Sequence, residues 1–119
     1  MYNQESFGAT WGPMYNLSNG SIVVDERAFS LVPNGLATAA TLSFGKDAYS
    51  TKTFPIEDIA GYKNGLLAWM TILLRNGDKL KISIGSKSKK LELIKALEQR
   101  RLAIFRDRGQ NAPRLVSII

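Results

Sequence analysis

Hydrophobic and polar residues alternate in short runs along most of the chain, and the pattern changes to a helical period at residue 86. Between residues 86 and 109 the apolar residues recur at helical spacing, which places them on one half of a helix circumference. This apolar half holds Leu91, Leu93, Ile94, Leu97, Leu102, Ile104 and Phe105. The other half holds mainly Lys95, Gln99, Arg100 and Arg106. The pattern predicts an amphipathic helix, over about 87–108, with one buried side.

Both ends of this helix carry residue types that favour helix termini. Ser86 and Ser88 are candidate N-caps, because a short hydroxyl accepts from the free amide groups of the first turn. Gly109 suits the left-handed residue that ends a helix. Glu98 and Arg101 interrupt the apolar half and divide it into two patches. We expect the N-terminal patch to cover a core and the C-terminal patch to extend past its edge.

The chain before the helix has the pattern of short strands, beginning with a hairpin. Residues 21–24 and 28–32 are β-branched or apolar runs, and the polar sequence 25–27 lies between them. A turn signal at 19–20 precedes this pair, and the Pro-Asn-Gly sequence at 33–35 ends it. Two short strands joined this tightly predict a β-hairpin.

Further strands are predicted in the middle of the chain. Residues 36–44 are compatible with a strand that ends at the turn sequence 45–47, and residues 51–56 form the next strand. Pro55 cannot donate to a ladder and therefore marks an edge or a bend of the sheet. After an acidic interruption, the strand pattern resumes at residues 59–62.

The strongest hairpin signal follows. Residues 66–74 are apolar, residues 75–78 form a tight-turn sequence, and residues 79–84 alternate polar with apolar side chains. Both faces of the first strand are apolar, which leaves two alternatives: the strand is covered on both sides, or its outer face is an exposed patch that meets a partner. That patch would consist of Leu67, Trp69 and Leu73.

The two ends of the chain are less regular. Residues 1–19 are rich in aromatic residues but also contain glycine and proline, so three alternatives stay open: a flexible lead-in, a cloning remnant or an irregular first strand. Residues 110–119 form an apolar tail that adds a strand either to this chain's own sheet or to the sheet of a neighbour. The tail residues that we expect to contact a partner are Leu115, Val116 and Ile118. Self-association through this tail or through the Leu67 face is a hypothesis.

Composition is that of one globular domain. The 119 residues are 45% hydrophobic and 22% charged, which is enough to bury a core. There is no cysteine, which excludes thiolate nucleophiles and thiolate metal sites, and no histidine, which is the commonest general base and metal ligand. An enzyme would need several of the scattered carboxylates to converge, and we expect no catalysis, no cofactor and no metal. No signal peptide or membrane span is visible, which favours a cytoplasmic protein, soluble or peripheral to a membrane.

Charge is concentrated in the predicted helix. The chain carries a net charge of +6, and residues 87–108 hold eight basic and three acidic residues, which accounts for +5 of it. The basic face of this helix is either simply solvated or attracts an anionic partner. An acidic phospholipid surface is favoured over nucleic acid, because no paired stacking aromatics accompany the lysines. The candidate anion-binding residues are Ser86, Lys87, Lys89, Lys90, Lys95, Arg100 and Arg101.

Many strands followed by one terminal helix exclude an alternating βαβ fold. The order predicts a mainly β protein, with a bent antiparallel sheet or partly open β-barrel that the helix caps. Residues 20–31 resemble the opening hairpin of GRAM and bacterial pleckstrin-homology (PH-like) domains, and residues 54–59 resemble their bent middle strand. The hairpin around 76–78 and the helix after it are similar to their closing elements.

This resemblance covers about residues 20–105, and it divides the chain into an irregular segment 1–19, a PH-like domain 20–109 and the tail 110–119. It implies a non-catalytic binding or adaptor module for a protein, peptide or lipid partner. Some family members hold phosphoinositide headgroups with basic residues around the first hairpin loop. Here that loop, 25–27, offers two acidic residues and one arginine, so those headgroup contacts do not carry over.

Overall fold

The computed structural model describes residues 3–12, 18–33 and 51–116. Seven strands, one short 3₁₀ helix and one long α-helix make up this part of the chain. Their order is β1 (Glu5–Trp11), β2 (Ser18–Val24), β3 (Ala28–Pro33), β4 (Lys52–Pro55), η1 (Ile56–Asp58), β5 (Ile59–Asn64), β6 (Trp69–Leu74), β7 (Lys79–Ser83) and α3 (Lys87–Asp107). The predicted class, mainly β with one C-terminal helix, is therefore confirmed.

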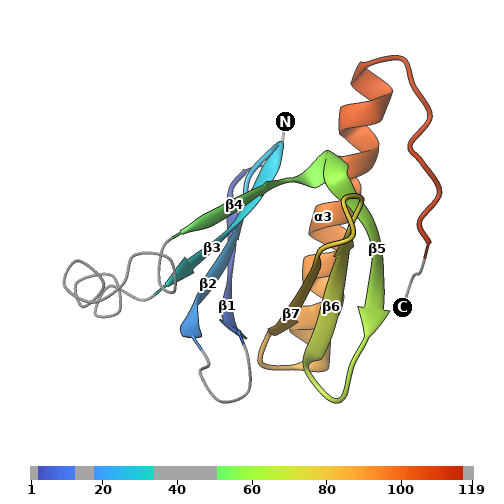
Figure 1. Cartoon of the computed structure of the whole chain (residues 1–119). Helices are drawn as coiled ribbons and strands as arrows, with labels where there is room; N and C mark the ends of the chain where they lie inside the picture. The colour runs from blue at the N-terminus through green and yellow to red at the C-terminus, as the bar shows by residue number, and fades with distance from the viewer. Residues whose placement is uncertain (1–2, 13–17, 34–50, 117–119) are drawn as a thin grey trace.

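The strands form one antiparallel sheet in the order β4-β3-β2-β1-β7-β6-β5. β4 and β5 are at opposite ends of this order, yet only the three residues of η1 join them along the chain. The sheet must therefore curl until its two edges come close. The result is a partly open barrel, and α3 lies across it (Figure 1).

The core is the inside of this barrel. Along β6 buried residues alternate with half-buried ones, and β2 and β3 show the same alternation over most of their length, as a sheet with one dry face requires. Phe29 stacks on Phe54 with the ring centroids 5.3 Å apart. The fully buried apolar side chains include Ile22, Val24, Phe29, Ile56, Tyr62, Met70, Ile72, Ile82, Leu93 and Leu97. The core thus joins both halves of the sheet to α3.

Turn chemistry located most of the hairpins. The predicted turns at 25–27 and 75–78 are confirmed, and Pro55 lies on the edge strand β4 as expected. Two details were wrong: the expected turn at 19–20 lies inside β2, and β6 begins at Trp69 rather than at residue 66. The strand predicted at 36–44, the turn at 45–47 and Ile118 lie outside the described residues.

The N-terminal segment supplies a regular strand, and this strand is central. β1 pairs with β2 along its whole length and with β7 at one end, so it connects the two halves of the sheet. Phe7 and Trp11 are buried in the core. Gly20 of β2, which pairs with Ala9 of β1, has no room for a side chain. A Cβ there would lie 2.8 Å from the Trp11 ring and 2.1 Å from the Val32 carbonyl oxygen. Residues 5–11 of the segment expected to be irregular therefore form a regular strand.

The predicted helix is confirmed, with the expected ends. The Ser86 hydroxyl accepts from the Lys89 N–H at 3.2 Å, and Gly109 has φ +69° just after the helix. The predicted sidedness was partly wrong: Leu91 and Leu102 are exposed, and Arg100 is buried. Ile104 and Phe105 of the second apolar patch are buried, so this half of the helix also covers the core rather than extending past its edge. No helix among the described residues is long and apolar enough to cross a membrane.

Candidate functional site

Three exposed leucines lie together where the β5–β6 loop approaches the start of α3. Leu66, Leu67 and Leu91 are 79%, 67% and 60% exposed, and we call them the leucine patch. With Lys87 they line a shallow cavity of about 350 Å³. A cluster of large exposed apolar side chains is typical of an interaction surface.

The loop that carries this patch is fixed by a buried lysine. The Lys90 ammonium donates to Asn64 Oδ1 at 2.6 Å, to the Leu67 carbonyl at 2.8 Å and to the Trp69 carbonyl at 3.3 Å. Leu67 has φ +54°, a conformation that is costly for a leucine. Gly65 packs so closely that a Cβ would lie 2.8 Å from the Trp69 carbonyl oxygen. These contacts stabilise the main chain of the loop, and Leu66 and Leu67 extend from it into solvent.

The outer face of β6 adjoins the leucine patch, because Trp69 and Leu66 line a common cavity. Trp69 and Leu73 are half-buried, and the Lys81 ammonium lies 5.8 Å from the centre of the Trp69 ring. Leu67 precedes β6 and belongs to the leucine patch instead. The predicted set of Leu67, Trp69 and Leu73 thus lies partly in the leucine patch and partly on the outer face of β6 beside it.

Three of the predicted anion-binding cations are inside the fold. Besides Lys90, Arg100 and Arg101 are buried. Arg100 donates to the Ala96 and Asn3 carbonyls, and it forms an ion pair of 3.0 Å with Glu5. These cations bind the N-terminal segment, the β5–β6 loop and the tail to the helix, so they are not available at the surface.

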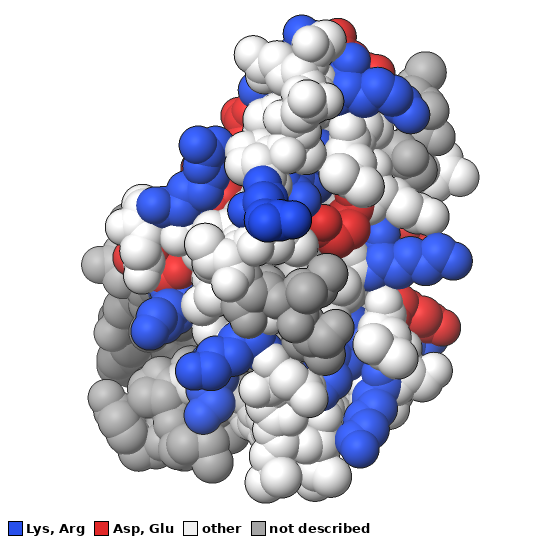
Figure 2. All heavy atoms as spheres, turned by 90° about the vertical axis from the view of Figure 1, so that its right-hand side faces the viewer, with Lys and Arg blue, Asp and Glu red and all other residues white. Residues whose placement is uncertain are grey.

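The remaining residues of that set are exposed. Lys87, Lys89 and Lys95 are on the surface, Lys89 pairs with Glu92 at 3.2 Å, and Ser86 caps the helix. On the face seen in Figure 2, Lys and Arg side chains form separate groups with Asp and Glu among them. Anion binding by these residues stays a prediction.

The tail packs along β5. The Val116 N–H donates to the Ala60 carbonyl at 2.7 Å, and Leu115 packs against the core. Figure 1 shows the tail descending beside β5 and α3. Of the predicted tail contacts, Leu115 thus faces its own chain, while Val116 is 76% exposed.

A polar network holds the tail in this position. The Glu98 carboxylate accepts two bonds from Arg101, at 2.7 and 3.0 Å, and one from the Tyr62 hydroxyl at 2.9 Å. Arg101 also donates to the Pro113 carbonyl at 3.0 Å. Burial, followed by the negative charge of Glu98 and its hydrogen bond, raises the pKa of the Tyr62 phenol well above its usual value.

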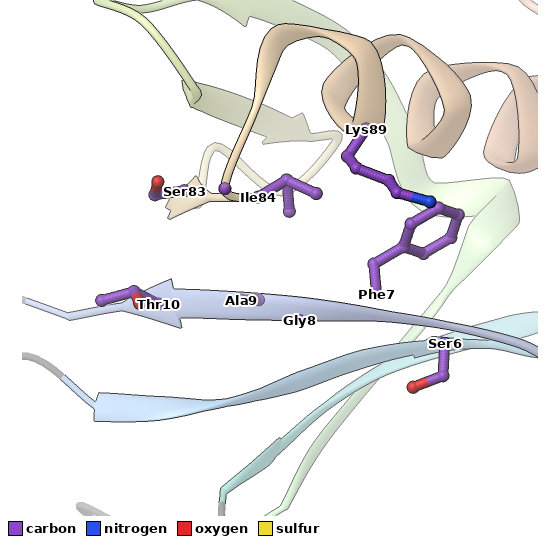
Figure 3. Close-up of a pocket in the computed structure, with 9 residues that line it drawn as sticks. Ser6, Phe7, Gly8, Ala9, Thr10, Ser83, Ile84 and Lys89 are labelled. Carbon is purple, nitrogen blue, oxygen red and sulfur yellow. The ribbon is translucent and has the colours of Figure 1, made fainter.

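A larger cleft of about 490 Å³ lies between β1 and the segment that leads from the end of β7 into α3 (Figure 3). Its lining residues are Ser6, Phe7, Gly8, Ala9, Thr10, Ser83, Ile84, Gly85 and Lys89. The Lys89 side chain extends from the first turn of α3 toward the ring of Phe7. None of the lining residues is acidic, and Lys89, the one cation among them, pairs with Glu92 of its own helix at 3.2 Å.

The carboxylates considered for catalysis do not converge. Glu57 pairs with Arg108, Asp25 accepts from Gln4, and Asp78 accepts from Asn76. Within the described ranges, no group of three or more acidic residues is placed to hold a metal ion.

Sequence reasoning missed two features of these surfaces. Leu66 was assigned to a strand, although the preceding glycine is a signal for a loop, and the cleft beside Gly8 depends on the pairing of a strand that was not resolved from the sequence. Long-range pairing leaves no local signal.

No protein-family model matches the chain, and no curated protein is significantly similar to it in sequence. Solved structures do match. The PH domain of human oxysterol-binding protein-related protein 11 gives a TM-score of 0.67 at 8% identity, over 93% of this chain and 90% of that one. The N-terminal PH domain of human ARAP2 gives a TM-score of 0.63 at 12% identity, over 85% of this chain and 81% of that one.

A chain of the Spt16D–Pob3N heterodimer also matches, with a TM-score of 0.61 at 16% identity, over 98% of this chain and 55% of that one. Similarity at this level of identity establishes the fold and nothing finer. The expected PH-like architecture, a bent antiparallel sheet with one C-terminal helix, is the fold of this chain.

Proposed function

We propose that this domain is a non-catalytic PH-like adaptor of the GRAM or bacterial type that recognises a protein, and that the protein docks on the leucine patch. The observation that carries this proposal is the exposure of Leu66, Leu67 and Leu91 side by side, next to a loop whose main chain is hydrogen-bonded to the buried Lys90. Burying exposed leucines gives about 25 cal/mol per Å² of apolar surface, which supplies affinity without any chemistry.

The rim of the patch indicates the kind of partner. Lys87 borders the leucines, and no acidic residue lines the cavity beside them. A symmetric dimer through this patch would bring Lys87 close to its own copy, which disfavours self-association here. The partner is therefore an apolar surface with an acidic rim. The Spt16D–Pob3N match, taken from a heterodimer, supports a protein partner for this fold.

Random peptides displayed on phage and selected on the intact domain test this proposal. Selected peptides should combine apolar and acidic residues, and Leu67→Asp should weaken their binding by more than about tenfold, as expected for a central contact. Leu102→Asp is the matched control, because Leu102 is 52% exposed on the same helix outside the patch.

Three outcomes would contradict the proposal. Peptide binding that is equally strong in both variants would exclude the patch, and sedimentation as a dimer that Leu67→Asp dissociates would make a second copy the partner. Binding to phosphatidylserine vesicles that falls with salt and is lost in Leu67→Asp would assign the patch to an acidic phospholipid surface. Lys87 and the exposed Lys89 and Lys95 make this the second candidate.

A further inference from the structure

β1 has a main-chain partner on only one side over most of its length. It pairs with β2 from Glu5 to Trp11, but with β7 only at Thr10 and Trp11. Among the residues that the structure describes, Glu5–Ala9 therefore lack a second strand, and the cleft of about 490 Å³ borders Ser6 to Ala9. An unpaired strand edge is a template for another strand.

The register of β2 determines which main-chain groups of β1 face this cleft. Antiparallel pairs alternate between those that exchange hydrogen bonds and those that do not. The Asp25 N–H donates to the Ala28 carbonyl at 2.8 Å, so the bonded pairs between β2 and β3 continue from there at every second residue. They are Val23 with Ser30 and Ser21 with Val32. Pro33, which has no N–H, agrees with this assignment because it falls opposite Gly20 in a non-bonded pair.

The alternation continues from β2 into β1. The other β2 residues direct their main-chain groups toward β1. They are Gly20, Ile22 and Val24, and their β1 partners are Ala9, Phe7 and Glu5. The N–H and C=O groups of Ser6 and Gly8 consequently point away from β2, toward the cleft. Thr10 is the next residue in this series, and it is the one that pairs with Ser83 of β7.

We propose that the cleft binds an extended peptide segment of a partner protein, which adds a strand to β1 and places an acidic side chain at Lys89. Ser6 and Gly8 offer two N–H donors and two C=O acceptors at the spacing of a strand edge. Lys89 is the charged residue of the lining, and its ammonium, which has three N–H donors, pairs with the exposed Glu92 at 3.2 Å. The remaining donors favour a peptide carboxylate over a cation.

A Cβ built at Gly8 would have nothing within 4 Å, so the outer face of β1 is open at this residue and Gly8→Ala fits without a clash. The site is distinct from the leucine patch, since the two share no lining residue. It thus goes beyond the proposed function and gives the domain a second point of contact.

Gly8→Pro tests the main-chain contacts. Proline removes the N–H that points into the cleft and fills its place with a ring, while the bonds from β1 to β2 use other residues. Gly8→Ala is the comparison, because it retains the N–H. The probe is a synthetic array of peptides in which Val and Thr alternate with Glu, Ser or Lys, and binding is measured by fluorescence anisotropy on the full chain.

We expect Glu-containing peptides to bind best, and Gly8→Pro to bind them on the order of tenfold more weakly than Gly8→Ala. N-methylation of the peptide main chain should have the same effect on the unaltered protein, which keeps the test valid if Gly8→Pro does not fold. Lys89→Ala should reduce the preference for Glu over Lys, whereas Lys95→Ala on the same helix should leave it unchanged.

The inference is overturned if no peptide of the array binds, if N-methylated peptides bind as well as unmodified ones, or if Lys-containing peptides bind as well as Glu-containing ones. Leu67→Asp separates the two sites. Peptides held at β1 should keep their affinity in that variant, whereas partners of the leucine patch should lose theirs.

Discussion

Two strand edges of this barrel are treated differently by the rest of the chain. Along β5 the C-terminal tail contacts the edge at Ala60, where the Val116 N–H donates to its carbonyl, and the buried Arg101 of α3 donates to the Pro113 carbonyl of the tail. Along β1, from Ser6 to Ala9, a cleft borders the edge instead. One edge is thus contacted by the chain's own tail, and the other borders a cleft lined by a lysine.

The difference shows how a small barrel keeps an edge accessible without exposing all of them. Exposed edges promote aggregation, and a closing segment of the same chain removes that hazard at β5. At β1 the open stretch is short and has a cation over it, which limits the segments that pair with it. The predictions below test whether the tail really closes the first edge and whether the second is really free.

The largest expected effect comes from Glu98, which connects β5, α3 and the tail. Glu98→Ala leaves the buried Arg101 guanidinium without its carboxylate and the Tyr62 hydroxyl without its acceptor. We expect a loss of about 3 kcal/mol in the free energy of unfolding, measured by urea denaturation. Glu92→Ala, which breaks only the exposed pair with Lys89, should cost less than about 1 kcal/mol. Equal losses would mean that the network does not hold the tail.

Local sequence patterns predicted much of this fold, but they did not predict the contacts between residues far apart in the chain. Turn residues and alternation located the hairpin around 25–27, and capping residues located the ends of α3, because each depends on neighbours in sequence. The burial of Arg100 depends on Asn3 and Glu5 at the other end of the chain, and no local pattern reports such a partner. For the same reason the sequence grouped Arg100 with surface cations.

Truncation after Gln110 should have the next largest effect. It removes the Pro113 carbonyl from Arg101, the packing of Leu115 and the bond to Ala60. We expect about 2 kcal/mol of lost stability and faster hydrogen exchange in β5. Sedimentation should show a monomer for the full chain and association of the truncated one through the uncovered edge. A full chain that is a dimer and a truncated chain that is a monomer would instead assign the tail to self-association.

Tyr62 makes the same region sensitive to high pH. Because the pKa of its phenol is raised in the folded state, the folded chain retains this proton after the unfolded chain, with a pKa of about 10, has lost it. The contribution of the protonated Tyr62 to the free energy of unfolding is complete below pH 10. It declines as pH rises further, by about 1.4 kcal/mol per pH unit. Urea denaturation between pH 9 and 11 should show a smaller slope for Tyr62→Phe than for the unaltered chain. Identical slopes would show that the phenol ionises freely in the fold.

Gly8→Pro should have the smallest effect on stability. A small effect is the expected result if the Gly8 N–H faces the cleft and has no partner in the fold. The register directs the Gly8 N–H into the cleft, so Gly8→Pro removes no bond to β2 and should change the free energy of unfolding by less than about 1 kcal/mol. Ala9→Pro, one residue along, removes the N–H that faces Gly20 and should cost about 3 kcal/mol or more. Thermal and urea denaturation of both variants measure this difference. If the two prolines were equally damaging, the Gly8 N–H would have a partner inside the fold, and the β1 edge would be as closed as the β5 edge.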